Sequence, residues 1–325
     1  MNRPKVVVTR RMPQEAIELL EKEANVYVWD SEETAIPQTV LLEQVKDAAG
    51  ILTNVADSID KEVLDAAPSL KVISTMAVGY DNIDIAEAAR RGIAIGHTPG
   101  ILTEATADLT FALLMASGRR VAEGAAYVKE GKWKSWGPML LTGQDVYGAT
   151  IGIIGMGRIG EGIARRAAGF DMNILYHNRS RKPDIEKSLN AEYCSLDSLL
   201  ERSDFVVLLA PSTPETYRMM GEREFKLMKS SAVFINASRG KNVDEQALYE
   251  ALQDGEIWAA GLDVFDEEPV SLDNPLLSLS NVTALPHIGS ASIKTRTKMA
   301  VVAAQNLLAG LAGTELLFEV KGDTV

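Results

Sequence analysis

Short apolar runs alternate along the chain with longer stretches in which apolar residues recur at helical spacing. In the first hundred residues these runs predict five strands, at 6–9, 26–29, 51–53, 71–75 and 93–95. After residue 149 a second series predicts strands at 150–155, 173–176, 205–209, 232–236, 259–262 and 282–284. Strands separated by helices indicate parallel sheets with helices on both faces. We therefore expect an α/β fold with two doubly wound parallel-sheet domains.

Two long helical patterns accompany these strands. One helix is predicted over 103–131, with Thr103 as its N-cap, and another over 290–311. The loop after the first helix contains Trp133 and Trp136. These two side chains either cover the edge of a core or contact another subunit, because aromatic residues are enriched at interfaces.

The composition narrows the class of partner. The chain has 325 residues, with 33 Lys and Arg against 45 Asp and Glu, for a formal net charge of −12. An acidic chain of this kind disfavours nucleic acid and anionic membranes as partners, since both select a basic surface. It also means that a site for a small anion must overcome an acidic background.

The number of cysteines and the N-terminal residues indicate in which cellular compartment the protein is expected. Cys194 is the one cysteine, so we expect no internal disulfide and no cysteine-based metal site. The first residues run straight into a strand-like segment without the apolar core of a signal peptide, and no stretch approaches the length of a membrane span. We therefore expect a cytoplasmic protein without a metal.

A glycine-rich turn is the most informative local motif. Gly155, Gly157 and Gly160 follow an apolar strand and open a helical pattern, which is the context that dinucleotide binding requires. The first glycine allows the tight turn, the second lets the backbone approach a pyrophosphate, and the third allows close packing of the helix. Arg158 and Ile159 lie at the start of that helix, where N–H groups attract phosphate.

The segment at the end of the next strand bears on cofactor choice. An acidic residue is expected there to bind the ribose of NAD, yet the segment contains Asn178, Arg179, Ser180 and Arg181. Arginines pair well with a 2′-phosphate, which a carboxylate would repel. We predict a preference for NADP(H), with NAD(H) also possible; the alternative is a basic loop that is merely solvated.

Three ionisable residues directly follow strands of the second series. They are Arg239, Glu268 and His287. The carboxyl ends of strands in an open parallel sheet line the ligand crevice. Side chains suited to acid–base chemistry and to anion binding are thus expected at one edge, whereas His97 is expected to cap or pack in the first domain.

Four segments in this order resemble the D-isomer-specific 2-hydroxyacid dehydrogenases: 155–160, 236–240, 263–269 and 286–291. The resemblance covers nearly the whole chain. Within the family, residues 178–180 and 136–138 are most similar to the glyoxylate/hydroxypyruvate reductases and the 2-ketogluconate reductases.

The resemblance implies roles in catalysis. His287 is the expected general acid, and Glu268 is expected to hold its imidazole. Arg239 is expected to bind the carboxylate of the substrate and polarise its 2-oxo group, while Val78 and Gly79 offer backbone N–H groups to the same carboxylate. The loops 54–58 and 76–80 are expected to set the size of the pocket.

The resemblance also implies further contacts with the cofactor, beyond the glycine turn and the 178–180 segment. These contacts are expected from Thr106, Pro211, Thr216, Ala237, Ser238, Asp263 and Gly289.

Motif order and resemblance together predict an inserted domain. A Rossmann-type dinucleotide-binding domain, 101–287, would interrupt a flavodoxin-like substrate domain made of 1–100 and 288–325. The resemblance further implies a homodimer, with 103–148 forming much of the interface.

The expected activity is reduction of glyoxylate, hydroxypyruvate or 2-ketogluconate to a D-2-hydroxy acid. One alternative is a D-3-phosphoglycerate dehydrogenase. Another, from a different class, is a dinucleotide-sensing corepressor that binds partner proteins.

Overall fold

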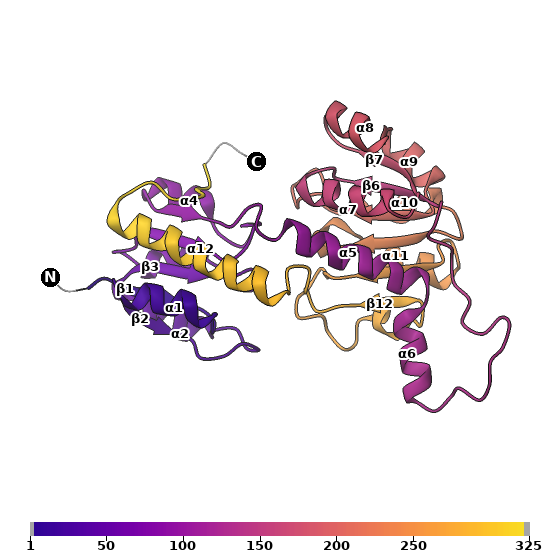
Figure 1. Cartoon of the computed structure of the whole chain (residues 1–325). Helices are drawn as coiled ribbons and strands as arrows, with labels where there is room; N and C mark the ends of the chain where they lie inside the picture. Colours follow the sequence, from indigo (N-terminus) through magenta and orange to yellow (C-terminus); the bar gives the residue numbers. More distant parts are fainter. Residues whose placement is uncertain (1–2, 322–325) are drawn as a thin grey trace. The chain divides into compact units, whose positions relative to one another are not determined.

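The chain divides into two compact units in the computed structural model, which describes residues 3–321. Met1–Leu102 and Ser290–Val325 form one unit, and Thr103–Gly289 forms the other (Figure 1). We call them the five-stranded unit and the seven-stranded unit after their sheets. Within residues 3–321, no helix is both long and apolar enough to cross a membrane.

The five-stranded unit contains a parallel sheet of order β2-β1-β3-β4-β5. Its strands are β1 (Lys5–Val8), β2 (Asn25–Val28), β3 (Ala48–Thr53), β4 (Val72–Thr75) and β5 (Ala94–Gly96). Its helices are α1 (Gln14–Glu21), α2 (Gln38–Gln44), α3 (Lys61–Ala66), α4 (Ile85–Arg90) and α12 (Ile293–Ala312), with a short 3-10 turn at Val45–Asp47. This strand order is that of flavodoxin-like sheets.

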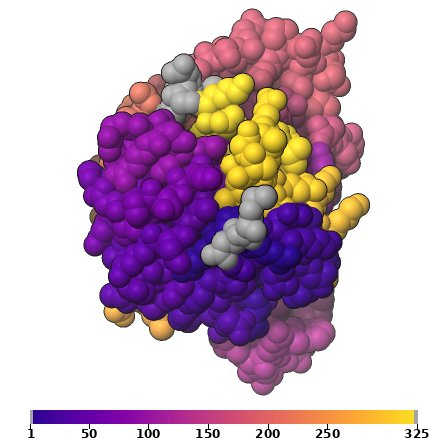
Figure 2. All heavy atoms as spheres, turned by 90° about the vertical axis from the view of Figure 1, so that its left-hand side faces the viewer, coloured from indigo at the N-terminus to yellow at the C-terminus, as the bar shows by residue number. Residues whose placement is uncertain are grey.

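Helices cover both faces of this sheet. On one face, α1 and α12 pack on Val6, Val8 and Leu52, which alternate with side chains on the opposite face. On that opposite face, α2, α3 and α4 pack on Val7 and Ile51. Figure 2 shows α12, in yellow, lying against the indigo N-terminal segments. Residues of α12, α1 and β1 therefore belong to one hydrophobic core.

The seven-stranded unit contains a parallel sheet of order β12-β11-β10-β9-β6-β7-β8. Its strands are β6 (Thr150–Ile154), β7 (Asn173–His177), β8 (Glu192–Tyr193), β9 (Phe205–Leu208), β10 (Val233–Asn236), β11 (Ala259–Leu262) and β12 (Val282–Ala284). Its helices are α5 (Thr103–Gly118), α6 (Val121–Lys129), α7 (Arg158–Ala168), α8 (Pro183–Leu189), α9 (Leu196–Arg202), α10 (Glu222–Leu227) and α11 (Glu245–Gln253). Short 3-10 turns occur at Gly240–Asn242 and Pro275–Ser278.

Strand order places the reversal of this sheet between β6 and β9. In doubly wound sheets, ligands bind beyond the carboxyl ends of the strands at such a reversal. One face is covered by α5 and α7 and the other by α9, α10 and α11. The predicted α/β class with two parallel sheets is confirmed.

The predicted helix over 103–131 is wrong in one respect, because the structure divides it into α5 and α6. Arg120, between them, has a left-handed backbone with φ of 53°. The cause is tertiary, since Gln144 donates its N–H to the Gly118 carbonyl at 2.8 Å and the 143–144 backbone packs on the end of α5. Figure 1 shows α6 and the loop after it projecting away from the sheet.

Candidate active site

The glycine turn lies at the carboxyl end of β6, next to the reversal of the sheet. Gly155 has φ of 103°, and a Cβ atom there would lie 2.8 Å from the Leu209 carbonyl carbon. A Cβ atom at Gly160 would lie 2.6 Å from the Gly155 oxygen, whereas one at Gly157 would meet nothing within 4 Å. The backbone at Gly155 and Gly160 therefore packs tightly on the protein, whereas the backbone at Gly157 has open space in front of it. Such open space at the N-terminus of α7 fits a pyrophosphate.

Asn178 ties the glycine turn to the end of β7. Its Oδ1 accepts the Met156 N–H at 2.8 Å. Arg179 and Ser180, which follow, are exposed. A role in shaping the turn is thus visible for Asn178, in addition to the cofactor contact that the sequence predicts.

The two arginines of this segment differ in their surroundings. Arg181 forms an ion pair with Glu186, with Nε donating to Oε1 at 3.0 Å, so part of its donor set is occupied. The pKa of Glu215 is lowered, chiefly by the Thr213 hydroxyl and in part by the charge of Arg179. Arg179 therefore lies close enough to the loop after β9 for its charge to favour the ionised form of Glu215.

The loop after β9 is closed by Thr216. Its Oγ1 donates to the Pro211 carbonyl at 2.6 Å and accepts the Thr213 N–H at 2.8 Å. At the start of the same loop, the Ala210 carbonyl accepts a hydrogen bond from Nδ2 of the fully buried Asn242 at 2.8 Å. Thr216 and Pro211 thus bond to each other at the sheet edge where the sequence predicts their contact with a cofactor.

Asp263, just past β11, holds the turn that carries His287. Its Oδ1 accepts the Ile288 N–H at 2.7 Å and its Oδ2 accepts the Gly289 N–H at 2.8 Å. Burial raises the pKa of Asp263, although these two N–H groups and the charge of His287 act in the opposite direction. Thr106 packs against Gly289, so three predicted cofactor residues lie together.

Asn236, at the end of β10, shapes the turn that carries Arg239. Its Oδ1 accepts the backbone N–H of Ser238 at 3.0 Å and the Ser238 hydroxyl at 2.8 Å. Its Nδ2 donates to the Arg239 carbonyl at 3.0 Å. The sequence alone predicts no role for Asn236, and the one signal that points to it is its position at a strand end beside Ala237.

Gly240 joins the Arg239 turn to the loop after β11. A Cβ atom at Gly240 would lie 1.8 Å from the Phe265 carbonyl carbon and 2.2 Å from the Asp266 nitrogen. No side chain fits at that distance, so the backbone at 240 packs directly on the peptide that leads toward Glu268. The two loops therefore hold a fixed spacing.

Glu268 and His287 form a hydrogen-bonded pair at the carboxyl edge of the sheet. His287 Nδ1 lies 2.7 Å from Glu268 Oε2, and Glu268 Oε1 accepts the Phe265 N–H at 3.0 Å. Burial raises the pKa of Glu268, but the hydrogen bond and charge of His287, with a contribution from Arg239, lower it below its ordinary value. The carboxylate is thus ionised at neutral pH, and it orients the imidazole.

The structure brings Arg239, Glu268 and His287 to the carboxyl ends of three neighbouring strands, β10, β11 and β12. The side chains of His287 and Glu268 are 31% and 35% exposed, so the pair lies at the surface of the seven-stranded unit rather than in its core. Val78 and Gly79 lie in the five-stranded unit, just past β4. Their alignment with Arg239 on one carboxylate stays a prediction.

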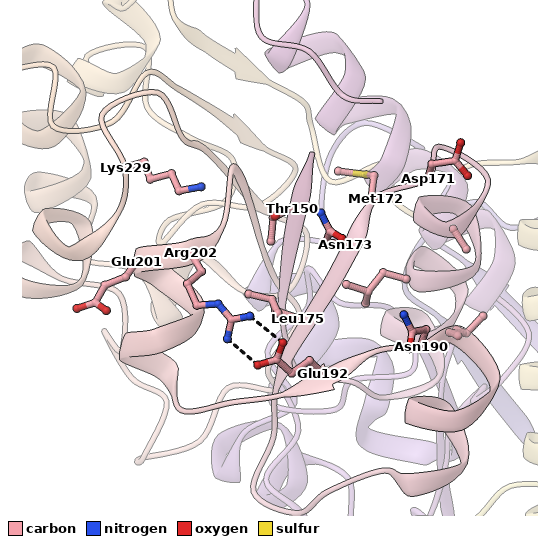
Figure 3. Close-up of a pocket in the computed structure, with 13 residues that line it drawn as sticks. Thr150, Asp171, Met172, Asn173, Leu175, Asn190, Glu192, Glu201, Arg202 and Lys229 are labelled. Carbon is pink, nitrogen blue, oxygen red and sulfur yellow. Dashed lines mark hydrogen bonds and ion pairs between the residues drawn. The ribbon is translucent and has the colours of Figure 1, made fainter. Parts of the chain in front are cut away.

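A cavity of about 840 Å³ lies at the opposite, amino edge of the seven-stranded sheet (Figure 3). Its two cations are already paired. Arg202 donates to Glu192 through its two terminal guanidinium nitrogens, Nη1 and Nη2, and Lys229 donates to Asp204 at 2.8 Å. Within residues 3–321, no group of three His, Cys, Asp or Glu side chains is placed to hold a metal ion.

Residues 111–289 match the family described as D-isomer specific 2-hydroxyacid dehydrogenase, NAD binding domain. A glyoxylate reductase of Korarchaeum cryptofilum is 51% identical over 308 residues, which are 94% of this chain and 92% of that relative. A solved protein from Thermus thermophilus aligns with a TM-score of 0.91 at 46% identity, over 98% of this chain and all of that chain.

A second solved relative is an NADPH-dependent glyoxylate/hydroxypyruvate reductase from Sinorhizobium meliloti in complex with NADP and malonate. It aligns with a TM-score of 0.85 at 33% identity, over 98% of this chain and 97% of that chain. The matches span both units, and the family match alone covers more than half of the chain. The chain therefore belongs to the D-isomer specific 2-hydroxyacid dehydrogenases and is an NAD(P)-dependent oxidoreductase.

Proposed function

We propose that the chain is an NADPH-preferring reductase that converts small 2-oxo acids to D-2-hydroxy acids. The proposed substrates are glyoxylate, hydroxypyruvate and 2-ketogluconate. The observation that carries the proposal is the His287–Glu268 pair, at 2.7 Å, beside Arg239 on the same sheet edge as the glycine turn. The names of the relatives, glyoxylate reductase and glyoxylate/hydroxypyruvate reductase, support the substrate class.

The hydrogen bond between Glu268 and His287 determines which imidazole nitrogen can transfer a proton. Ionised Glu268 only accepts, so Nδ1 of His287 carries a hydrogen in both protonation states. The exchangeable proton is then on Nε2, which gives it to the carbonyl oxygen of the substrate. A bound reduced nicotinamide dinucleotide supplies the hydride.

Arg239 binds the substrate in this proposal. A guanidinium offers a planar set of donors that matches a carboxylate, and its charge polarises the adjacent 2-oxo group. The backbone N–H groups of Val78 and Gly79 complete the carboxylate site. The five-stranded unit is accordingly the substrate domain, and the seven-stranded unit is the cofactor domain.

Preference for NADPH rests on Arg179. Its side chain is exposed at the end of β7, where an acidic residue would select NAD. Arg181 is held by Glu186, so Arg179 is the main cation for a 2′-phosphate, with Asn178 and Ser180 as polar neighbours. The Sinorhizobium meliloti relative, named NADPH-dependent, supports the same preference.

The test is a comparison of kcat/KM on the purified protein. Glyoxylate, hydroxypyruvate and 2-ketogluconate are each supplied with NADPH and with NADH. We expect turnover of at least one acid and a higher kcat/KM with NADPH. Absence of turnover on all three refutes the substrate class, and a preference for NADH refutes the cofactor assignment alone.

We further propose a homodimer. Large apolar side chains of α6 and the loop after it are exposed: Val121, Val128, Trp133, Trp136, Met139, Leu140 and Tyr147. Trp136 is 79% exposed, so in the single chain it covers no core edge. Exposed apolar surface of this extent is typical of a subunit contact. Light scattering should give twice the 35.2 kDa chain mass, and an unchanged monomer mass overturns the proposal.

Trp136 is proposed to reach the site of the second subunit. Trp136→Ala should then lower kcat/KM as well as weaken the dimer. Unaltered activity of a dimeric Trp136→Ala variant contradicts that contact.

A cytoplasmic location completes the proposal. Cys194 is the single cysteine, and burial raises the pKa of its thiol, so it fits a reducing compartment as a packing residue. Fractionation of the native cells checks the location.

A further inference from the structure

The segment after β5 contacts two successive carbonyl groups of the turn after β4. The Ala77 oxygen accepts the Thr98 backbone N–H at 2.8 Å and the Thr98 hydroxyl at 3.0 Å. The next carbonyl oxygen, that of Val78, lies 3.0 Å from Nδ1 of His97. Because a carbonyl oxygen only accepts, His97 Nδ1 carries the hydrogen and donates it.

These contacts determine where the N–H groups of the turn point. Within residues 3–321 the one cis peptide is Glu268-Pro269, so the peptides after Ala77 and Val78 are trans. In a trans peptide the C=O and the N–H point in opposite directions. The N–H groups of Val78 and Gly79 therefore both point away from residues 97–98. Two successive N–H groups on one side form a concave site for an anion.

We propose that His97 is a positioning residue for the substrate carboxylate, and this inference rests on the proposed function. By holding the Val78 oxygen, its imidazole fixes the plane of the peptide that contains the Gly79 N–H. That N–H then remains directed at the carboxylate, without reorientation when substrate binds. His97 itself does not touch the substrate.

The backbone of His97 is in turn held by two residues from the C-terminal part of the chain, Asn306 and Phe318. Its N–H donates to the Phe318 carbonyl at 3.1 Å, and its carbonyl accepts Nδ2 of Asn306 at 2.9 Å. Asn306 is fully buried on α12 and also accepts the Phe318 N–H at 3.0 Å. The ring of Tyr80 meets the imidazole edge-on, with centroids 5.5 Å apart. His97 is thus held through its backbone and by the contact of its ring with Tyr80.

The two contacts can be separated by mutation. Thr98 holds the Ala77 carbonyl partly through its backbone, which Thr98→Val preserves. His97 holds the Val78 carbonyl through its side chain alone. His97→Leu therefore frees the Val78–Gly79 peptide, whereas His97→Asn keeps an N–H donor close to the position of Nδ1.

The experiment compares His97→Leu, His97→Asn and Thr98→Val in the full-length protein. KM and kcat are measured with glyoxylate and NADPH. Binding of oxamate, an unreactive 2-oxo acid analogue, is measured by calorimetry on the protein saturated with NADPH. NADPH affinity and Tm are measured alongside.

For His97→Leu we expect KM and the oxamate Kd to rise about tenfold, the effect of one lost hydrogen bond to a charged group. We expect kcat and NADPH affinity to stay within about twofold, since the general acid and the glycine turn are untouched. His97→Asn should recover most of the loss, and Thr98→Val should shift KM less than His97→Leu does.

Three results overturn the proposal. These are an unchanged KM and oxamate Kd in His97→Leu, equal losses in His97→Asn and His97→Leu, or a parallel fall of kcat, NADPH affinity and Tm that marks a general structural defect. Failure of the proposed function looks different, because the wild-type protein then turns over none of the three acids.

Discussion

The two sheets share one architecture, yet their carboxyl edges are built differently. The seven-stranded edge presents Arg239, Glu268 and His287 on three neighbouring strands. The five-stranded edge presents polar side chains that are turned inward to hold its loops. Asp57, which is 4% exposed, is the centre of that network. The seven-stranded edge thus supplies reactive side chains, whereas the polar side chains of the five-stranded edge fix the backbone conformation of its loops.

Asp57 shows how the second edge works. Its Oδ2 accepts the Thr53 hydroxyl at 3.0 Å and Asn54 Nδ2 at 2.7 Å, and it also accepts the Thr9 hydroxyl. Asn82 donates to the carbonyls of Asn54 and Asp57 at 2.9 and 2.6 Å. The ends of β1 and β3, the loop 54–58 and the segment at Asn82 are thereby joined. Substitutions on the two edges should therefore affect different measurable quantities.

The largest effect is expected for His287→Asn. Asn tolerates the left-handed backbone of position 287, with φ of 52°, and its amide remains near Glu268. It has no group at the position of Nε2, so the acid is lost and kcat should fall about 100- to 10,000-fold. NADPH affinity, measured by fluorescence titration, should stay the same. Near-normal kcat would contradict the acid assignment.

Glu268→Gln should give a smaller loss of kcat than His287→Asn. The carboxylate, whose pKa is lowered, is ionised throughout the neutral range and stabilises the protonated imidazole. Without its charge we expect about a tenfold lower kcat, since a charged hydrogen bond becomes a neutral one. NADPH affinity should stay the same. A wild-type kcat in this variant would contradict a role for the charge of Glu268.

Arg179→Ala tests the cofactor side of the seven-stranded edge. Loss of one charge-assisted hydrogen bond should raise the NADPH Kd about tenfold and leave the NADH Kd unchanged. Arg181→Ala is the matched control, because Glu186 already occupies its guanidinium. Equal effects of the two variants would mean that the segment acts by net charge.

Asp57→Asn tests the five-stranded edge and should act on stability. The hydrogen bonds of the network all fall on Oδ2, so the amide nitrogen would take the place of Oδ1, which forms an ion pair with Arg10 at 3.8 Å. Loss of that buried ion pair should cost about 1–3 kcal/mol of unfolding free energy with kcat little changed. Burial raises the pKa of Asp57 against the effect of its hydroxyl donors. Its contribution to stability is then full below the unfolded pKa and is lost as pH rises through the folded pKa.

The difference in Tm between wild type and Asp57→Asn should therefore be largest at acid pH and narrow toward neutrality. Thermal unfolding across that range measures it. A large fall in kcat at constant Tm would contradict the assignment of the Asp57 network to stability, because the network would then take part in the chemistry.

The sequence predicts those parts of the molecule that depend on local pattern. The glycine turn and the three strand-end residues follow from an apolar run, a helical pattern and fixed spacing along the chain. The roles of Asn236 and His97 depend instead on which loops meet in space. His97 and Val78 are 19 residues apart. The break at Arg120 has the same origin, since the segment that packs there comes later in the chain.

The contact of Gly240 with the Phe265–Asp266 peptide bears on how such a protein changes substrate. Arg239 and Glu268 stand on loops that touch without room for a methyl group, so selection cannot move one of them without the other. Natural diversification and laboratory evolution should therefore leave the 239–240 and 265–268 segments intact and change the substrate through other segments of the chain.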